Sequence, residues 1–443
     1  MAKNISGKNH GTYKTIVNIE NSNMEMKIPV HYGEQTIDLS IPQENLCFNL
    51  HRNEFRPPES EVEEIKKAIQ HPIGTKRLGE IVPKDASVVI LADDRTRVTP
   101  QKLIIPVILE ELHRAGVKNE QIKLIIAYGT HRPMTEEEIE ERFGRELMDQ
   151  ISIRHHNCHH NLVVHGVTRR GTRIVVNKEV MEADFRIGVG GVLPHHPVGW
   201  SGGAKIFLPG VAGTETVNAM HLLGATEQQL GKILTPCREE MEDFATEVGL
   251  HFIVNVIQTD SGDLLKAVAG HFIDAHREAV KWGMHIFGAK FSEKADITIS
   301  SAYPSDYDFT QADKGLFSAE LATKQGGDII LLSPCDEGIA PTHGEEIGRL
   351  ARYDDQTLWK MLEDNVIKDR FGASECMYLN HIKRNFKATL TMDSVLTNIL
   401  GFHHLDVNNV QKYLETRISL DKKVKIGILH YSSEVLPVPA SES

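Results

Sequence analysis

Long apolar runs are missing from this sequence, and their absence argues against a transmembrane protein. No run approaches the roughly 20 consecutive apolar residues that a helix needs to cross a bilayer. The chain opens with MAKNISGKNHGTYK, which is polar and lacks the apolar core of a secretion signal. We therefore expect a cytoplasmic protein with no membrane partner.

Positive charge is also scarce. Lys and Arg total 49 against 61 Asp and Glu, so the formal net charge is −12, and no long basic run occurs. A phosphate backbone binds to a basic surface, so the composition predicts no nucleic-acid partner. Small organic acids can still bind locally, at single basic side chains.

Cysteine is rare and scattered. The sequence has five cysteines and no C-x-x-C pair: Cys47, Cys158, Cys237, Cys335 and Cys376. Neither a disulfide framework nor a thiol redox motif fits this pattern. We expect reduced thiols with mainly structural roles.

The most prominent pattern in the sequence is a set of apolar, β-branched runs that end in small or polar residues. They occur at 87–97, 122–132 and 184–196, and each is typical of a buried parallel strand that opens into a loop. A run with helical apolar spacing, 102–118, lies between the first two and follows Pro100. The pattern predicts a β-α-β unit.

A second set of strand-like runs follows later in the chain. Residues 295–306 and 326–338 are separated by the helix-like 314–325. Before them, 251–270 predicts a hairpin turning at Asp260, Ser261 and Gly262, followed by a helix over 274–288.

The 443 residues exceed what one hydrophobic core usually supports. We predict an α/β protein of two domains, each with a mainly parallel sheet flanked by helices, and a boundary near residue 290. The N-terminal domain would span 1–290, possibly joined by the C-terminal strand within 423–443, which could return to either sheet. The C-terminal α/β domain would span 291–422.

Titratable residues gather where the predicted strands end. Asp93, Asp94, Arg97, His131 and His195 all follow the carboxyl end of a strand. In open α/β sheets the ligand crevice lies at that edge. The functional site is therefore predicted there.

Lys205 stands in HHPVGWSGGAKIFLPG, residues 195–210, where most neighbours are small or apolar. The spacing excludes a phosphate-binding P-loop, because Lys205 follows Ala204 and precedes Ile206. The lysine could be an ordinary anion-binding or helix-end residue. It could also be a covalent attachment point, because bare backbone lets a bulky group lie flat against the chain.

Five further residues are candidates for chemistry. His221 lies on a short predicted helix and is either a packed histidine or a metal ligand. His131 and His195 suit a pair of acid/base groups, since imidazole titrates near neutral pH, although loop histidines often only bind backbone. Arg97 and Lys314 could anchor a carboxylate, with salt bridges to acidic residues as the competing explanation.

The histidine-rich segment RHHNCHHN, residues 154–161, resembles a metal trap. Alternate residues of an extended segment face opposite ways, and no zinc-type spacing is met. A structural role is the favoured interpretation, with a zinc-dependent hydrolase as an alternative.

Taken together, four motifs resemble the nickel-pincer-nucleotide lactate racemase family. They are DDRTRVTP, GTHRPMT, LPHHPVGWSGGAKIFLPGVAG with its trailing NAMH, and YPSDYDFTQADKG, in the same order over nearly the whole chain. The resemblance implies an active site in an interdomain cleft. It also implies that Lys205 binds the cofactor, pyridinium 3,5-bisthiocarboxylic acid mononucleotide, through a thioamide, and that His221 is the fourth ligand of a square-planar Ni(II).

The same resemblance implies an isomerase, a racemase or epimerase that inverts C2 of a 2-hydroxy acid. Hydride would pass to and from the covalent cofactor while His131 and His195 alternate as acid and base. It further implies substrate contacts from Arg97, Gln311 and Lys314, and cofactor contacts from Asp94, Thr96, Ser201, Gly202 and Gly203. Cofactor-maturation enzymes are the implied protein partners, while the sequence defines no oligomeric state.

Departures from the family concern the pocket. Trp200 precedes SGG where phenylalanine is usual, Tyr128 sits before the GTHRP motif, and His196 adds a second ring beside His195. Such changes leave the substrate as lactate or as a larger hydroxy or sugar acid. A non-catalytic carrier of the nickel-pincer cofactor or of a metal is the alternative function.

Overall fold

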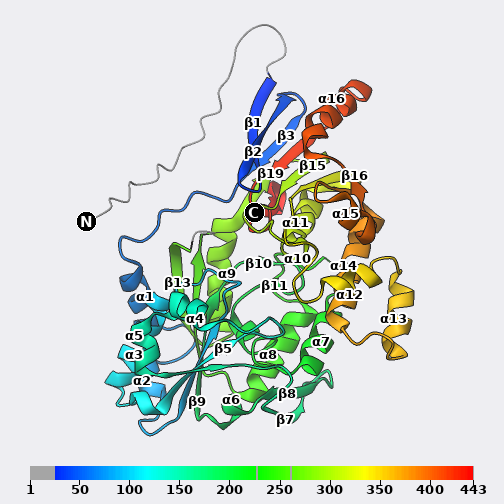
Figure 1. The fold of residues 1–443 in the computed structure, drawn as a ribbon. Coiled ribbons are helices and arrows are strands. Elements are labelled where there is room, and N and C mark those ends of the chain that lie inside the picture. Colours follow the sequence, from blue (N-terminus) through cyan, green and yellow to red (C-terminus); the bar gives the residue numbers. More distant parts are fainter. Residues whose placement is uncertain (1–24, 226–227, 260–261, 443) are drawn as a thin grey trace, which may run out of the picture.

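Two six-stranded sheets organise the computed structural model, which describes residues 25–225, 228–259 and 262–442 (Figure 1). Both sheets are mainly parallel and are flanked by helices, which confirms the predicted α/β class. No helix within the described ranges has the length and apolar character needed to cross a membrane. The five cysteines are free.

The first sheet has the strand order β13-β12-β9-β4-β5-β6. All neighbouring pairs are parallel except β12 and β13, which form the predicted hairpin. The turn residues Asp260 and Ser261 lie outside the described residues. The strands are β4 (Val88–Asp93), β5 (Ile122–Ala127), β6 (Ser152–His155), β9 (Phe185–Gly191), β12 (Phe252–Gln258) and β13 (Leu264–Gly270).

β4 shows why these runs form central strands. Val88 and Ile90 pack on one face of the sheet against Ile104 of α3, while Val89 and Leu91 belong to the apolar core on the opposite face. Because side chains alternate across a strand, a run buried on both faces must be apolar throughout. The strands predicted at 87–97, 122–132 and 184–196 are confirmed as β4, β5 and β9.

Helices and short hairpins surround the first sheet, and α3 and α9 confirm the helices predicted at 102–118 and 274–288. The helices are α1 (Glu61–Gln70), α2 (Leu78–Ile81), α3 (Gln101–Arg114), α4 (Glu136–Phe143), α5 (Arg145–Gln150), α6 (Lys178–Glu182), α7 (Thr214–Leu223), α8 (Pro236–Val248) and α9 (Asp274–Phe287). The hairpins pair β7 (Leu162–Val167) with β8 (Arg173–Asn177) and β10 (Pro194–His195) with β11 (Gly199–Trp200).

The second sheet is parallel throughout, in the order β18-β17-β16-β15-β19-β3. Its strands are β3 (Leu46–Leu50), β15 (Ala295–Ser301), β16 (Thr323–Leu332), β17 (Lys387–Leu390), β18 (His403–His404) and β19 (Ile426–Leu429). Its helices are α10 (Phe309–Ala312), α11 (Lys314–Ala322), α12 (Gly344–Leu350), α13 (Asp355–Glu363), α14 (Arg370–Asn385), α15 (Ser394–Leu400) and α16 (Val410–Leu420). The strands and helix predicted between 295 and 338 are confirmed as β15, α11 and β16.

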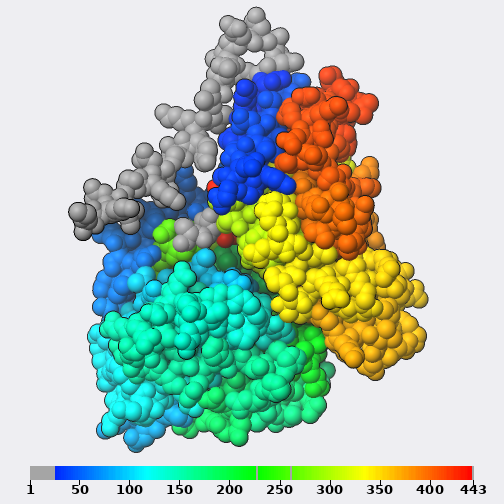
Figure 2. Space-filling view, in the orientation of Figure 1, coloured from blue at the N-terminus to red at the C-terminus, as the bar shows by residue number. Residues whose placement is uncertain are grey.

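The sheets divide the chain differently from the expected boundary. β19 pairs with β15 on one side and with β3 on the other, so the C-terminal strand and residues 46–50 both join the second sheet. The hairpin of β1 (Glu25–Tyr32) and β2 (Gln35–Pro42) packs its apolar side chains on the same sheet. Figure 2 shows these blue strands beside the orange C-terminal segment and away from the cyan body. A domain boundary near residue 290 stays a prediction.

One continuous apolar core links the two sheets. It runs from Leu91 of the first sheet, through Phe207 and Leu208 of the segment after Lys205, to Leu316 of α11 and Leu331 of the second sheet. The loops at the facing ends of the sheets are therefore held by shared packing, which fixes the residues of one sheet relative to those of the other.

The contact between β3 and β19 gives a test of this topology. A Cβ on Gly427 would lie 2.0 Å from Cζ of Phe48, which leaves no room for a methyl group. Gly427→Ala should lower the free energy of unfolding by about 1–3 kcal/mol, measured by chemical denaturation, because an overpacked strand contact must shift. Gly79→Ala is the matched control, since its Cβ would meet nothing closer than 3.7 Å. Equal denaturation midpoints for Gly427→Ala and Gly79→Ala would contradict the pairing of β3 with β19.

Candidate active site

A cavity of about 470 Å³ lies where loops of the two sheets face each other. It has the size of a small-molecule or cofactor site. Every site residue predicted from the sequence lines it: Asp94, Thr96, Arg97, His131, His195, Ser201, Gly202, Gly203, Lys205, His221, Gln311 and Lys314.

The topology of the first sheet explains where this cavity forms. After β4 the chain builds β5 and β6 on one side, and it later builds β9 and β12 on the other. Loops that leave β4 and β9 therefore diverge, which opens a crevice at their carboxyl ends. Asp94 and His195 follow those two strands.

The glycine bend, residues 199–203, forms the floor beside Lys205. Gly202 and Gly203 have φ of +76° and +59°, conformations that favour glycine. A Cβ would lie 2.5 Å from Val192 at Gly202 and 2.9 Å from His276 at Gly203. Bare backbone is therefore required at both positions.

Buried polar side chains hold this bend from below. Asn255 accepts a hydrogen bond from the Gly203 amide at 2.8 Å, and His276 lies 2.9 Å from the Ser201 carbonyl. Arg238, which is fully buried, donates to the carbonyls of Gly202, at 3.0 Å, and Trp200. The bend is thus fixed before any ligand binds.

The Ser201 hydroxyl is used within this framework. It donates to the Gly191 carbonyl at 2.9 Å and accepts from the Leu193 amide at 2.8 Å. Its side chain therefore shapes the loop between β9 and the bend.

Lys205 lies on a 3-10 turn (Gly203–Ile206) directly after the bend. Burial, followed by the positive charges of Arg97, Arg238 and Lys314, lowers the pKa of Lys205 to about 7. Within the described part of the chain its amine has no hydrogen bond or ion pair. Lys205 is therefore a nucleophilic, largely neutral amine in slightly alkaline solution.

His221 faces the same cavity from α7. Burial, followed by the charge of Lys205, lowers the pKa of His221 to about 3. The ring packs edge-on against Phe371 with 5.1 Å between centroids, and neither nitrogen has a hydrogen-bond partner among the described residues. A neutral imidazole with free nitrogens is the form that binds a metal.

These features test whether a covalently held, metal-bearing group fits. The amine of Lys205 and the imidazole of His221 line one cavity, both are neutral near physiological pH, and glycine backbone lies beside the amine. The residues therefore fit a flat group attached to Lys205 whose metal takes one nitrogen ligand from His221.

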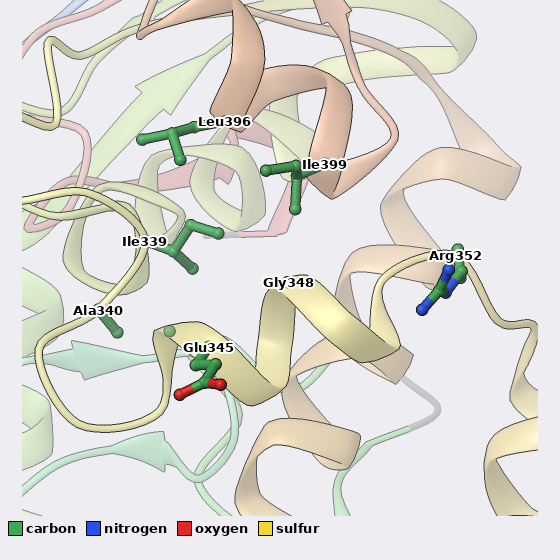
Figure 3. A pocket seen from close by; sticks show the side chains of 8 residues that line it. Ile339, Ala340, Glu345, Gly348, Arg352, Leu396 and Ile399 are labelled. Atoms are coloured by element: carbon green, nitrogen blue, oxygen red, sulfur yellow. The ribbon is translucent and has the colours of Figure 1, made fainter.

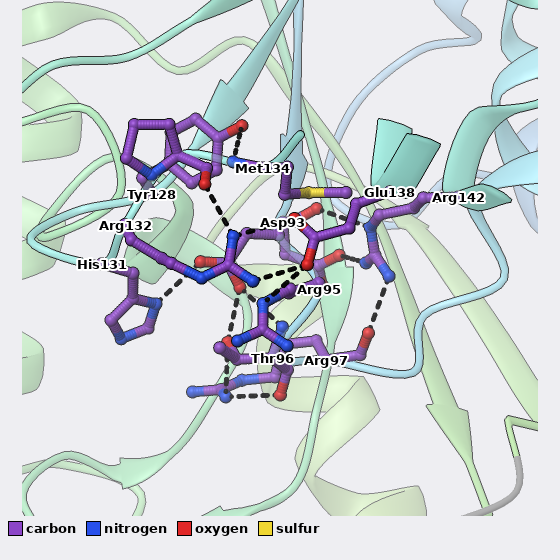
Figure 4. Close-up of polar contacts among 12 residues, drawn as sticks. Asp93, Arg95, Thr96, Arg97, Tyr128, His131, Arg132, Met134, Glu138 and Arg142 are labelled. Atoms are coloured by element: carbon purple, nitrogen blue, oxygen red, sulfur yellow. Dashed lines mark hydrogen bonds and ion pairs between the residues drawn. The ribbon is translucent and has the colours of Figure 1, made fainter. Parts of the chain in front are cut away.

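His131 is paired with Asp94. Nδ1 of His131 lies 2.7 Å from Oδ2 of Asp94, whose other oxygen accepts from the Thr96 amide at 2.9 Å (Figure 4). Burial alone would raise the pKa of Asp94, but His131, Thr96 and Arg97 hold it well below its usual range. With Nδ1 directed at this carboxylate, Nε2 is the ring nitrogen left for a ligand.

His195 approaches from the β10–β11 hairpin and is more enclosed. The His131 side chain is 46% exposed, whereas the Nδ1 atom of His195 is buried without a partner in the described structure. Burial, followed by the charge of Lys205, lowers the pKa of His195 well below its usual value. The cavity thus holds two histidines that enter it from different elements.

Arg97 and Lys314 both line the cavity, and the charge of Arg97 acts on the Lys314 amine. The amine of Lys314 donates to Gln311 at 2.5 Å, and Arg97 donates to the Thr96 carbonyl at 2.9 Å. Burial, followed by Arg97, lowers the pKa of Lys314 to about 8. The mutual repulsion is the electrostatic mark of an anion site.

Sequence reasoning missed the role of α4. The helix is acidic, yet the Arg142 side chain on it is only 10% exposed. It donates to the carbonyls of Asp93, at 2.9 Å, and Arg97, at 2.7 Å, and pairs with the Asp93 carboxylate (Figure 4). The loop that carries Asp94 and Arg97 is therefore anchored by this helix, and a lone arginine after a run of glutamates was the available signal.

The three residues that depart from the family pattern lie in different places. Trp200 is buried against Gly283, away from the cavity, and its indole donates to the Gly231 carbonyl at 2.9 Å. The Tyr128 hydroxyl accepts from the Met134 amide at 3.0 Å and so holds the loop. His196 stacks on Phe317 at 4.2 Å along the cavity wall. Tyr128 and His196 both line the cavity, and the ring of His196 lies beside that of His195.

The histidine-rich segment 154–161 is structural, as favoured. His156 is buried and bonds the Ala212 carbonyl at 3.1 Å, and His155 bonds the Tyr128 hydroxyl at 2.9 Å. In the described ranges no three His, Cys, Asp or Glu side chains are grouped to hold a metal. The zinc-hydrolase alternative therefore has no site there.

A larger hollow of about 640 Å³ lies outside the cavity, between α12 and α15 (Figure 3). Ile339, Leu396 and Ile399 make it mainly apolar, with Glu345 and Arg352 beside them. It brings together none of the predicted site residues, so the smaller cavity is the candidate active site.

Comparison with known proteins gives consistent matches. Residues 32–231 match the family model of the lactate racemase N-terminal domain. A lactate racemase of Thermoanaerobacterium thermosaccharolyticum is 28% identical over 420 residues, covering 90% of this chain and 96% of the relative. A lactate racemase of Lactiplantibacillus plantarum is 30% identical over 329 residues, covering 72% of this chain and 76% of the relative.

Solved structures agree. The lactate racemase apoprotein of Thermoanaerobacterium thermosaccharolyticum superposes with a TM-score of 0.82 at 27% identity, covering 93% of this chain and all of that one. A Thermotoga maritima protein superposes with a TM-score of 0.67 at 18% identity, covering 87% of this chain and 100% of that one, which shows a shared fold.

The low pKa of Lys205 can be tested on cofactor-free protein. Because its amine loses its proton near pH 7, a small acylating reagent should modify Lys205 readily at pH 8, with half-maximal rate near pH 7. Mass spectrometry of the Lys205 peptide across pH 5–10 measures this. Lys67, exposed on α1, reports the reagent's own pH dependence. Labelling of Lys205 that rises in step with Lys67 up to pH 10 would contradict the assignment.

Proposed function

The chain belongs to the lactate racemase family and is an isomerase, and from that premise we propose that it inverts C2 of a 2-hydroxy acid in the cavity between its sheets. The observation that supports this most directly is the joint placement of Lys205, His221, His131 and His195 along one cavity. Lactate is the simplest substrate, since both matched relatives are named lactate racemases.

Lys205 and His221 would hold the cofactor. The neutral amine of Lys205 is suited to form a thioamide with the nickel-pincer nucleotide, and one nitrogen of His221 would ligate the nickel. When bound, this group supplies a hydride acceptor and donor for C2. Gly202 and Gly203 offer bare backbone beside the amine, and Asp94 and Thr96 bound the same side of the cavity. Ser201 would contribute to cofactor binding indirectly, because its hydrogen-bonded hydroxyl maintains the shape of the loop.

Arg97 and Lys314 would bind the substrate carboxylate. Arginine supplies two parallel donors and lysine a point charge, and the anion relieves the repulsion between the two cations. Gln311 fixes the Lys314 amine at 2.5 Å and lies within reach of the same ligand. The substrate would be oriented by these three side chains.

His131 and His195 would exchange the hydroxyl proton. The α C–H of a 2-hydroxy acid is a very weak acid, so removing the more acidic hydroxyl proton is the easier route. Asp94 orients His131 with Nε2 free, and enclosure keeps His195 neutral and able to accept a proton. Each histidine would serve one enantiomer. The enzyme would act in the cytoplasm, together with the maturation enzymes that assemble the cofactor.

The proposal is tested with enzyme produced together with the maturation enzymes. The Lys205 peptide should carry the cofactor mass, and single enantiomers of lactate in deuterated water should lose optical rotation with little deuterium at C2. Lys205→Arg should abolish both the adduct and the inversion. An unmodified Lys205 in fully active enzyme would overturn the attachment. An adduct without inversion of any 2-hydroxy acid would favour a cofactor carrier.

The two histidines give a second prediction. His131→Gln and His195→Gln should each lower kcat by about 10²–10⁴-fold in both directions, because each is needed on one side of a reversible reaction. Chiral chromatography of both lactate enantiomers measures the rates, and the cofactor mass on Lys205 confirms loading. His159→Gln, in the structural segment, is the control and should keep full activity. Full activity in either test variant would refute its assigned role.

A further inference from the structure

One wall of the cavity is polar but takes no part in the proposed reaction. It is formed by α12, α14 and the loops before them, and it presents His343, Phe371 and Glu375 to the cavity. These residues lie on the second sheet's side, and none of them belongs to the recognised motifs. Their partners show what kind of group this wall can bind.

His343 is oriented by a carboxylate. Its Nδ1 atom lies 2.7 Å from Oδ2 of Asp369, which also caps α14 by accepting from the Gly372 amide at 3.2 Å. Burial would raise the pKa of Asp369, but His343 and these backbone bonds lower it, so the carboxylate is ionised. With Nδ1–H donated to Asp369, Nε2 is the ring nitrogen left for a ligand, and it has no partner in the described ranges.

Glu375 is backed by a second buried acid. Asp313 is fully buried, and neither of its oxygens has a donor among the described residues. Burial, followed by the neighbouring Glu375, raises the pKa of Asp313 well above its usual value, so Asp313 keeps its proton and hydrogen-bonds Glu375. Glu375 is only 4% exposed and lines the cavity. It therefore presents a carboxylate that is incompletely satisfied.

The wall thus offers hydrogen-bond acceptors to a bound ligand. The rings of His343 and Phe371 lie 4.4 Å apart, and Phe371 also contacts His221, so the wall is continuous with the site of reaction. A hydroxyl group donates to such acceptors. A methyl group leaves them unpaired, and a second carboxylate would be repelled by Glu375 and Asp369.

We infer that Glu375 and His343 are specificity-determining residues that bind a hydroxyl group carried beyond C2 of the substrate. This inference rests on the proposed function and narrows it to 2-hydroxy acids with a further hydroxyl. Such acids bind in preference to those ending in a methyl group or a second carboxylate.

The test compares three acids that differ only beyond C2: 2,3-dihydroxypropanoate, lactate and malate. With adduct-bearing enzyme, kcat/KM for 2,3-dihydroxypropanoate should exceed that for lactate by about tenfold or more, because a hydrogen bond to a charged acceptor is gained, and malate should be the poorest. Glu375→Leu and His343→Phe should each lower kcat/KM for 2,3-dihydroxypropanoate more than kcat/KM for lactate, which reduces the preference. Glu375→Gln, which keeps one acceptor oxygen, should retain part of it.

Glu345→Gln is the matched control, since Glu345 lies on α12 but faces the outer hollow (Figure 3). It should leave the preference unchanged. Equal or better use of lactate by the unaltered enzyme would overturn the inference. So would an equal loss for all three acids in both test variants, which indicates a structural role. The thermal midpoint of each variant shows whether that variant folds. If Glu375→Leu does not fold, His343→Phe still tests the inference.

A binding measurement separates this inference from the proposed function. Calorimetric titration of cofactor-free protein should show about tenfold tighter binding of 2,3-dihydroxypropanoate than of lactate, and the difference should vanish in Glu375→Leu. Equal binding would overturn the specificity assignment even if lactate is inverted. Failure of loaded enzyme to invert any acid, with the binding preference intact, would overturn only the catalytic proposal.

Discussion

The site depends on one bend of backbone, residues 199–203. This bend directs the side chain of Lys205 into an enclosed cavity. All three of its glycines have positive φ with no space for a Cβ, and Asn255, His276 and Arg238 satisfy its polar groups from below. Enclosure removes water from the lysine amine and leaves it neutral near pH 7. A surface lysine would be a hydrated cation, so its reactivity here is a property of the bend and of the packing beneath it.

The charges in the cavity are not balanced. Burial, followed by the charge of Arg97, lowers the pKa of Lys205 and of Lys314, while Asp94 is occupied by His131 and Thr96. An anionic substrate would compensate these cations, so the same repulsion that raises the energy of the empty cavity favours ligand binding. The wall of His343 and Glu375 lines the same cavity, and its acceptors suit neutral donors. The two sides would orient a hydroxy acid from its carboxylate to its far end.

Support for these groups comes from residues that never reach the cavity. Arg142 of α4 anchors the loop of Asp94 and Arg97, and Tyr128 ties the loop of His131 to the Met134 amide. The continuous core through Phe207 and Leu316 fixes the second sheet against the first. The substrate anchors Gln311 and Lys314 of the second sheet and the proton-transferring histidines of the first thereby keep a constant separation, which a reaction reversible at a single carbon requires.

The sequence by itself determined the strands β4, β5 and β9, the residues at their carboxyl ends and the motif residues that line the cavity, because local apolar periodicity and short spacings encode them. Tertiary structure alone decided that residues 46–50 and 426–429 pair in the second sheet, that Arg142 turns inward from an acidic helix, and that Trp200 lies away from the cavity. It also brought Asp313 against Glu375, and His343 against Asp369. Such contacts join residues far apart in the chain, and no local pattern records which distant side chain will occupy the neighbouring space.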